Sequence, residues 1–245
     1  MLLIALAIVI KTSLINITLL VLLTLVCLEF LAFLKNRIIS LLFLFLIIAT
    51  FILNYYISLL GIPYLYFLIG SMILGCIIWT SLFIRIVLYD NPIMGGREIC
   101  FAGFLMIMPS YISGAFISFA YAKILLLILI AVSFADSAAY FFGKKYGKRI
   151  LLQNTSPGKT LEGLIGAIIL TPAFLVLISD YLEIKLFGAI LLGLVITPIS
   201  FMGDVVFSFI KRSTNIKDSS SLIPGHGGFI DLLDGTIASL PFVAA

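Results

Sequence analysis

Long apolar runs, each close to the length that crosses a bilayer, dominate this 245-residue chain. A membrane-spanning helix needs about 20 consecutive apolar residues, and such runs follow one another from residue 13 onward. Only 11% of the residues are charged, against about 25% in soluble domains. Because too few polar groups remain to cover a water-soluble surface, the chain must fold in lipid, where helices satisfy their own backbone hydrogen bonds.

The runs predict an all-α fold, a polytopic transmembrane helix bundle with eight or nine spans. The opening run, 1–10, is short for a full crossing and lacks the basic start and the cleavage site of a secretory signal peptide, so we expect it in the mature protein. The other predicted spans are 13–34, 38–55, 64–86, 99–120, 123–142, 161–180, 186–210 and 229–244.

Two long polar loops, 143–160 and 211–228, interrupt an otherwise tightly connected chain. The short connections elsewhere predict one integrated membrane domain. Within it we expect 1–122 to supply lipid and subunit contacts, and 123–245 to carry the catalytic groups. An internal inverted repeat is typical of transporters, and its absence from this sequence favours an enzyme.

The placement of lysine and arginine predicts the sidedness of the bundle. If the spans alternate, twelve of these cations fall on one side, and only Lys11, Lys123 and Lys185 fall on the other. Cytoplasmic loops carry the excess of such residues, so both polar loops are predicted to face the cytoplasm, where nucleotides are found. The formal net charge is only +4, and we expect no nucleic-acid partner.

Two aspartates lie inside predicted spans, Asp136 in 123–142 and Asp204 in 186–210. Asp136 lies seven residues before Gly143 and Asp204 seven residues before Lys211, so each is roughly 10 Å inside the cytoplasmic end of its span. An acid at that depth is costly and usually functional, so we expect both to face one water-filled hollow. The alternative is that nearby lysines neutralise them for assembly alone.

A dense group of polar residues surrounds the second loop. Asp204, Ser208, Lys211 and Arg212 share one helical face, and Asp231 and Asp234 share another at the start of the last helix. Carboxylates and hydroxyls suit hard divalent cations. The single histidine, His226, and three cysteines without paired spacing disfavour zinc, so Mg²⁺ or Mn²⁺ is expected.

Glycine-rich turns in both loops predict phosphate contacts. The turn 224–228 precedes a helix whose N-terminal end favours anions. In the first loop, Ser156 is predicted to cap a helix that begins at Pro157, which places Lys159 and Thr160 in its first turn. The basic run 144–149 either contacts substrate or serves as a topology signal.

These residues resemble the phosphatidate cytidylyltransferases, also called CDP-diacylglycerol synthases. The resemblance is strong over 136–236, and the N-terminal half is similar only in being apolar. The matching signature positions are Ser208, Ile210, Lys211, Arg212, Lys217, Asp218, Ser220, Ile223, Pro224, His226, Gly227, Gly228, Phe229, Asp231 and Asp234. Further matches are Asp136, Ala139, Tyr140, Gly143, Lys144, Ser156, Pro157, Lys159, Thr160, Glu162, Gly163, Gly203 and Asp204.

The resemblance implies transfer of a cytidylyl group from CTP to phosphatidate at the cytoplasmic face of the cell membrane. It implies Mg²⁺, with room for a second metal ion, and a homodimer embedded in membrane lipid. The expected metal ligands are Asp204, Asp231 and Asp234. The expected nucleotide-binding and cofactor-binding residues are Asp136, Lys144, Lys159 and Ser208. The expected catalytic residues are Lys211, Arg212, Lys217, Asp218 and His226.

One position departs from the family. Where the family usually has Arg between the two final acids, this chain has Leu232. If that Arg contacts a substrate phosphate, either Arg212 takes its place or binding is weaker. The alternative activities are a CTP-dependent polyprenol or phytol kinase, a cytidylyltransferase for another lipid phosphate and, less in keeping with the sequence, a transporter.

Overall fold

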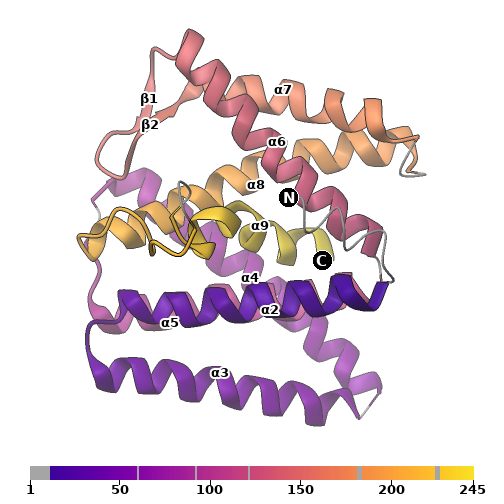
Figure 1. Cartoon of the computed structure of the whole chain (residues 1–245), viewed down its shortest axis with the longest axis vertical. Helices are drawn as coiled ribbons and strands as arrows, with labels where there is room; N and C mark the ends of the chain where they lie inside the picture. Colours follow the sequence, from indigo (N-terminus) through magenta and orange to yellow (C-terminus); the bar gives the residue numbers. More distant parts are fainter. Residues whose placement is uncertain (1–11, 60, 92, 121, 181–183, 224–226) are drawn as a thin grey trace.

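The computed structural model describes residues 12–59, 61–91, 93–120, 122–180, 184–223 and 227–245, and within them it is a bundle of α-helices with one small hairpin (Figure 1). The elements in chain order are α2 (Thr12–Phe30), η1 (Leu31–Phe33), α3 (Arg37–Ser58), α4 (Ile62–Tyr89), α5 (Gly96–Ala120), α6 (Ala122–Tyr146), β1 (Ile150–Leu152), β2 (Ser156–Thr160), α7 (Leu161–Ile178), α8 (Leu186–Ser213) and α9 (Phe229–Ala244). The predicted all-α bundle is confirmed.

Six of these helices, α3 to α8, are long and apolar enough to cross a membrane. A helix lies at each predicted span from 13–34 to 229–244, while the opening run 1–10 lies outside the described residues. The total of eight or nine spans stays a prediction, because α9 has only 16 residues. At about 1.5 Å per residue it is shorter than the roughly 30 Å apolar core of a bilayer.

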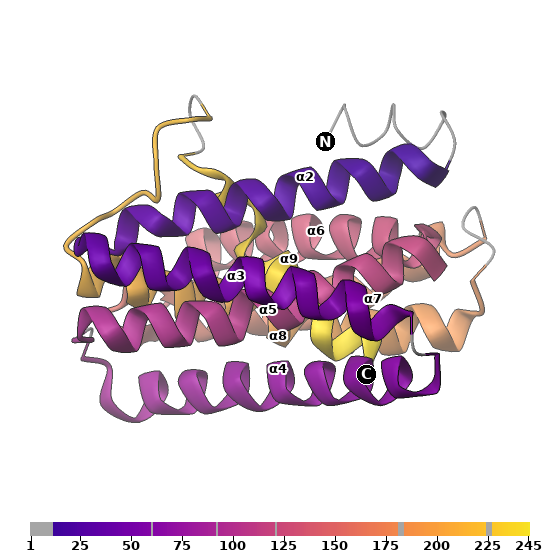
Figure 2. The same cartoon turned by 90° about the horizontal axis from the view of Figure 1, so that it is seen from below.

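The helix connections alternate between the two ends of the bundle. At one end, on the left in Figures 1 and 2, lie the links from α2 to α3 and from α4 to α5, the β1–β2 hairpin, and the loop 214–223 after α8. At the opposite end α3 meets α4, α5 meets α6, and α7 meets α8. Both long polar loops therefore lie at the same end, as the alternation of spans predicted.

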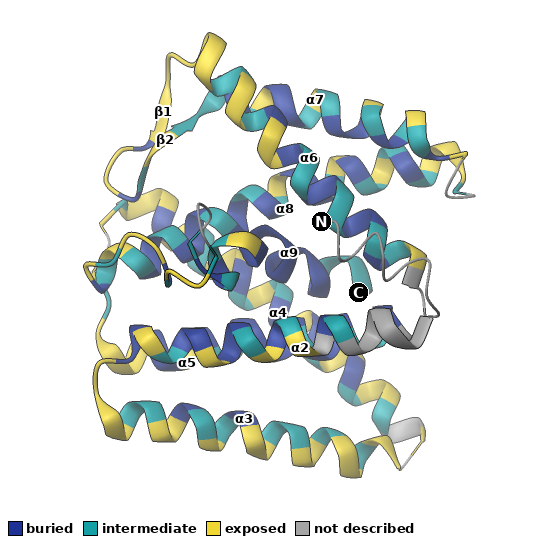
Figure 3. Cartoon of the chain, in the orientation of Figure 1, coloured by how far each residue is buried: buried dark blue, intermediate teal, exposed yellow. Residues whose placement is uncertain are grey.

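The short helix α9 occupies the middle of the bundle, where it packs against α8, α5, α4 and α2. Figure 3 shows it almost wholly buried, whereas α3 at the edge is largely exposed. Ile230, Ile237 and Leu240 are fully buried in the main apolar core. Since α9 is enclosed by protein, its polar residues face other helices instead of lipid.

The predicted helix beginning at Pro157 is wrong, because residues 156–160 form strand β2. They pair antiparallel with β1, Ile150 opposite Thr160 and Leu152 opposite Ser156. Thr160 has extended backbone angles and caps α7, its hydroxyl accepting from the Gly163 amide at 3.2 Å. Both Ser156 and Thr160 are suitable caps. Because residues 156–160 form backbone hydrogen bonds with β1, they stay extended, and the helix begins after Thr160 instead of after Ser156.

Asp90, the residue that ends α4, holds the hairpin in place. It adopts a left-handed conformation with φ of 35°, which Asp tolerates better than most residues. Its carboxylate accepts from the Asn154 amide (2.8 Å), the Thr155 amide (3.0 Å) and the Thr155 hydroxyl (2.7 Å). Burial opposes ionisation, but these hydrogen bonds outweigh it and lower the pKa of Asp90. The anchor therefore stays ionised at neutral pH.

Helices α8 and α9 approach closely at Gly203, and this contact generates a first prediction. A Cβ on Gly203 would collide with the Asp234 carbonyl oxygen and lie 2.8 Å from the Ala238 Cβ. Gly203→Ala is expected to lower stability by about 1–3 kcal/mol through overpacking, seen as a lower Tm in detergent. Gly70→Ala is the matched control, since that glycine is exposed with open space around it. Equal Tm values for the two variants would contradict the packing.

Candidate active site

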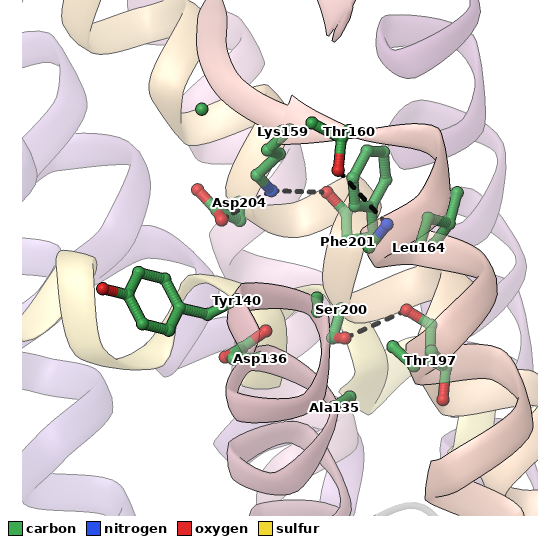
Figure 4. A pocket seen from close by; sticks show the side chains of 14 residues that line it. Ala135, Asp136, Tyr140, Lys159, Thr160, Leu164, Thr197, Ser200, Phe201 and Asp204 are labelled. Atoms are coloured by element: carbon green, nitrogen blue, oxygen red, sulfur yellow. Dashed lines mark hydrogen bonds and ion pairs between the residues drawn. The ribbon is translucent and has the colours of Figure 1, made fainter. Parts of the chain in front are cut away.

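A cavity of about 170 Å³ lies between α6, α7 and α8, next to the hairpin (Figure 4). Each of these elements contributes short or polar residues to its wall. The lining residues are Ala135, Asp136, Ala139, Tyr140, Gly158, Lys159, Thr160, Gly163, Leu164, Ala167, Thr197, Ser200, Phe201 and Asp204. The cavity therefore has a largely apolar wall that carries the charged groups Asp136, Lys159 and Asp204, and it lies at the hairpin end of the bundle, the location expected for the two acids.

The side chain of Lys159 forms the centre of this site. Its ammonium lies 2.5 Å from the Asp204 carboxylate, donates to the Phe201 carbonyl at 3.4 Å, and sits 4.4 Å from the centroid of the Phe201 ring. Ser208, one turn further along α8, donates to the other Asp204 oxygen at 3.2 Å. The shared face of Asp204 and Ser208, expected from their spacing, is confirmed.

Two further carboxylates interact electrostatically with this pair. Asp136 on α6 and Asp234 on α9 are each within electrostatic range of Asp204 and of Lys159. Asp136 is exposed to the cavity, whereas Asp234 is only 7% exposed and accepts from the Gly235 amide at 2.6 Å. Three acids thus face one ammonium group, and the site carries an excess of negative charge when all are ionised.

Asp231 belongs to a separate network at the start of α9. One of its oxygens accepts from Lys211 on α8 at 2.6 Å. The other accepts from the Gly228 amide (3.0 Å) and from both the amide and the hydroxyl of Ser219 (each 2.8 Å). With both oxygens occupied, Asp231 ties the start of α9 to α8 and to the preceding loop.

Four more of the predicted site residues lie at the same end but do not line the cavity. Lys144 is exposed at the end of α6, its ammonium 5.7 Å from the Tyr140 ring. Arg212, Lys217 and Asp218 are exposed at the end of α8 and in the loop that follows. His226 lies outside the described residues.

The expected metal set fits a divalent cation only in part. Within the described ranges, no three His, Cys, Asp or Glu side chains are close enough together to hold one ion. The excess negative charge and oxygen donors around Asp204 and Asp234 suit Mg²⁺ chemically. Both oxygens of Asp231, by contrast, already accept hydrogen bonds from other groups.

Sequence reasoning missed two acids that support the site, Glu29 and Asp90. Glu29 on α2 accepts from the Ile230 amide at the start of α9. A signal for Glu29 was present, since it is an acid inside the apolar run 13–34. Asp90 follows a span directly and precedes an Asn-Pro pair typical of turns, so only the fold shows that it contacts the hairpin.

Comparison with known proteins places the chain in a family. All of it, residues 1–245, matches the model of the Cytidylyltransferase family. A phosphatidate cytidylyltransferase of Haemophilus influenzae is 43% identical over 128 residues, 49% of this chain and 43% of that protein. One of Bacillus subtilis is 39% identical over 110 residues, 44% of this chain and 41% of that protein.

A third relative, the phosphatidate cytidylyltransferase of Pseudomonas aeruginosa, matches over a longer stretch. It is 33% identical over 191 residues, 73% of this chain and 69% of that protein. The match to the Haemophilus and Bacillus proteins spans about two fifths of their length. With a family model that covers every residue and a relative that matches over two thirds of both chains, this protein belongs to the Cytidylyltransferase family.

Proposed function

We propose that the chain transfers a cytidylyl group from CTP to phosphatidate, giving CDP-diacylglycerol and pyrophosphate. The observation that carries the proposal is the Lys159–Asp204 pair in a cavity that Asp136 also lines, with the buried Asp234 within electrostatic range. Charged groups in an apolar bundle are rare and usually functional. The relatives named phosphatidate cytidylyltransferase supply the substrate class.

In this reaction a phosphate oxygen of phosphatidate attacks the α-phosphorus of CTP. A new P–O bond forms, the bond from the α-phosphorus to the bridging oxygen breaks, and pyrophosphate leaves with the electron pair. A phosphatidate dianion is already nucleophilic, so the protein has mainly to align the reactants and neutralise charge. No covalent intermediate on the enzyme is required.

The basic residues would supply the neutralisation. Lys159 in the cavity and Lys211 near the end of α8 are each paired with an acid, and we propose that substrate phosphates take the place of these acids. Arg212, Lys217 and Lys144 surround the same end, and Arg212 is available to compensate for Leu232. Fixed donors aimed at developing charge are the largest contribution in reactions of this type. Asp218 and His226 remain candidates for positioning the phosphate-binding turn.

Magnesium is part of this proposal. Asp204 and Asp234 would hold Mg²⁺ together with the triphosphate, while Asp136 and Ser208 position these groups. When bound, Mg²⁺ neutralises phosphate charge and aligns the leaving group. The carboxylates would repel a triphosphate, so their negative charge favours a cation between them and CTP.

The membrane setting completes the proposal. The diacyl chains would stay in lipid between the helices while the headgroup enters the cavity from the hairpin end. That end would face the cytoplasm, because the loops gathered there carry most of the lysine and arginine residues. We propose an integral protein of the cell membrane that works as a homodimer, with helices of the 1–122 part at the subunit contact.

Double labelling of CTP tests the reaction. Purified protein is incubated with phosphatidate, Mg²⁺ and CTP labelled either in the cytosine ring or at the γ-phosphate. We expect the ring label in the lipid product and the γ label in free pyrophosphate, because the α–β bond is the one that breaks. Transfer of the γ label to lipid would show a kinase instead, and the proposal would be wrong.

Substitution of the cavity acids tests the site. Asp204→Asn and Asp234→Asn are each expected to lower kcat by about 100-fold or more, since each removes a charge that orients cations at the reacting phosphates. Asp180→Asn is the matched control, an exposed acid at the opposite end of the bundle. Wild-type turnover in both cavity variants, with the control also active, would rule out this cavity as the reaction site.

A double-mutant cycle separates two roles of Asp231. If Asp231 acts through Lys211, Asp231→Asn is expected to lower kcat about tenfold. The double variant, Asp231→Asn with Lys211→Met, is then expected to have the same kcat as Lys211→Met alone. If Asp231 instead binds Mg²⁺, the double variant falls well below either single one. The measurement is kcat for the four proteins at saturating CTP and two Mg²⁺ concentrations.

A further inference from the structure

The acid Glu29 lies deep in the bundle, in a part of the chain assigned above to lipid and subunit contacts. The residue is only 7% exposed. The Ile230 amide, 201 positions away, donates to its Oε2 at 2.7 Å. A buried carboxylate is costly unless it is paired, so a residue of this kind in an apolar helix calls for a specific role.

The Glu29 carboxylate meets α9 at the end where that helix binds anions best. The first amides of a helix have no partner within it, and the helix dipole is positive there. Its other oxygen, Oε1, is buried without a hydrogen-bond partner among the described residues. A Cβ on Gly228 would collide with this carboxylate and with the Ser219 hydroxyl. The backbone of Gly228 therefore packs directly on Glu29, and only glycine fits.

Two acids thus hold the start of α9, and each links it to a different part of the bundle. Glu29 connects it to α2, and Asp231 connects it to Lys211 on α8 and to Ser219 in the loop. Asp234 follows Asp231 by one helical turn and faces the cavity acids. A shift of α9 along its axis would move Asp234 and, through Asp231, the ammonium group of Lys211.

We propose that Glu29 is a positioning residue for the transfer reaction: its carboxylate fixes the start of α9 and thereby aligns Asp234 and Lys211 with the substrates. This inference rests on the proposed function. Glu29 is not among the residues that line the cavity, and its hydrogen bond goes to the start of α9, so it would act through that helix. The N-terminal half of the chain then contributes to the active site indirectly, through α9.

Kinetics of two size-matched variants test the role. Glu29→Gln keeps an oxygen that accepts from Ile230, and we expect kcat within about threefold of wild type. Glu29→Met keeps the volume and loses the acceptor, and we expect kcat to fall by at least about tenfold with little change in the KM for CTP, because misalignment affects the chemical step more than binding. Leu28→Met, a change at the exposed neighbour on α2, is the control.

Equal activity of the Met and Gln variants would overturn the proposal, because a side chain that only fills space does not need an acceptor oxygen. If Glu29→Met does not yield monodisperse protein, Glu29→Asp takes its place, since it keeps the charge but is too short to reach Ile230. Wild-type kcat in Glu29→Asp would likewise overturn it.

Hydrogen exchange without substrates gives a readout that does not depend on activity. In wild type the Ile230 amide is bonded to Glu29, and we expect at least tenfold faster exchange of the 227–233 amides in Glu29→Met, with Glu29→Gln close to wild type. If exchange is faster in Glu29→Met but the wild type transfers no cytidylyl group, the role of Glu29 in holding α9 is supported and the proposed function is wrong. Unchanged exchange with an active wild type would overturn the anchor and leave the function intact.

Discussion

The ion pair between Lys159 and Asp204 is the interaction on which the arrangement of the polar interior depends. It joins the hairpin to α8 across a cavity inside an otherwise apolar bundle. Charges in such surroundings interact strongly because little water screens them. With Asp136 and Asp234 close by, one ammonium group faces three acids. With all three acids ionised the site would carry excess negative charge, which suits the binding of a divalent cation there.

The groups around this pair are held by contacts that lie outside the cavity. Asp90 fixes the hairpin that carries Lys159, and Glu29 and Asp231 fix the start of the helix that carries Asp234. Each contact pairs a carboxylate with backbone amides that have no partner in their own element. Since lipid offers no hydrogen bonds, such pairs are an effective way to order loops at the end of a membrane bundle.

Much of the fold follows from local patterns in the sequence. The apolar runs predicted each helix from α2 to α9, because in lipid a helix is the simplest way to satisfy the backbone. The spacing of Asp204 and Ser208 placed both on one face of α8, and they are hydrogen-bonded. The depth of Asp136 and Asp204 in their spans predicted a common hollow, and one cavity contains both. Helical periodicity and residue depth suffice for these conclusions.

Other features depend on contacts between segments far apart in the chain. The motif around Lys159 forms a strand because β1 lies beside it. Ser156 and Thr160 are both good helix caps, so the local sequence does not tell at which of them α7 begins. Asp231 and Asp234 look equivalent in sequence, yet Lys211 and Ser219 donate to the first, while the second is buried within electrostatic range of Asp204 and Asp136. The sequence by itself determined the helices, the end where charge gathers and the family. Only the packing of α2 and α8 around α9 decided which donors each acid meets, because the hydrogen-bond partners of Glu29 and Asp231 lie in segments far apart in the chain.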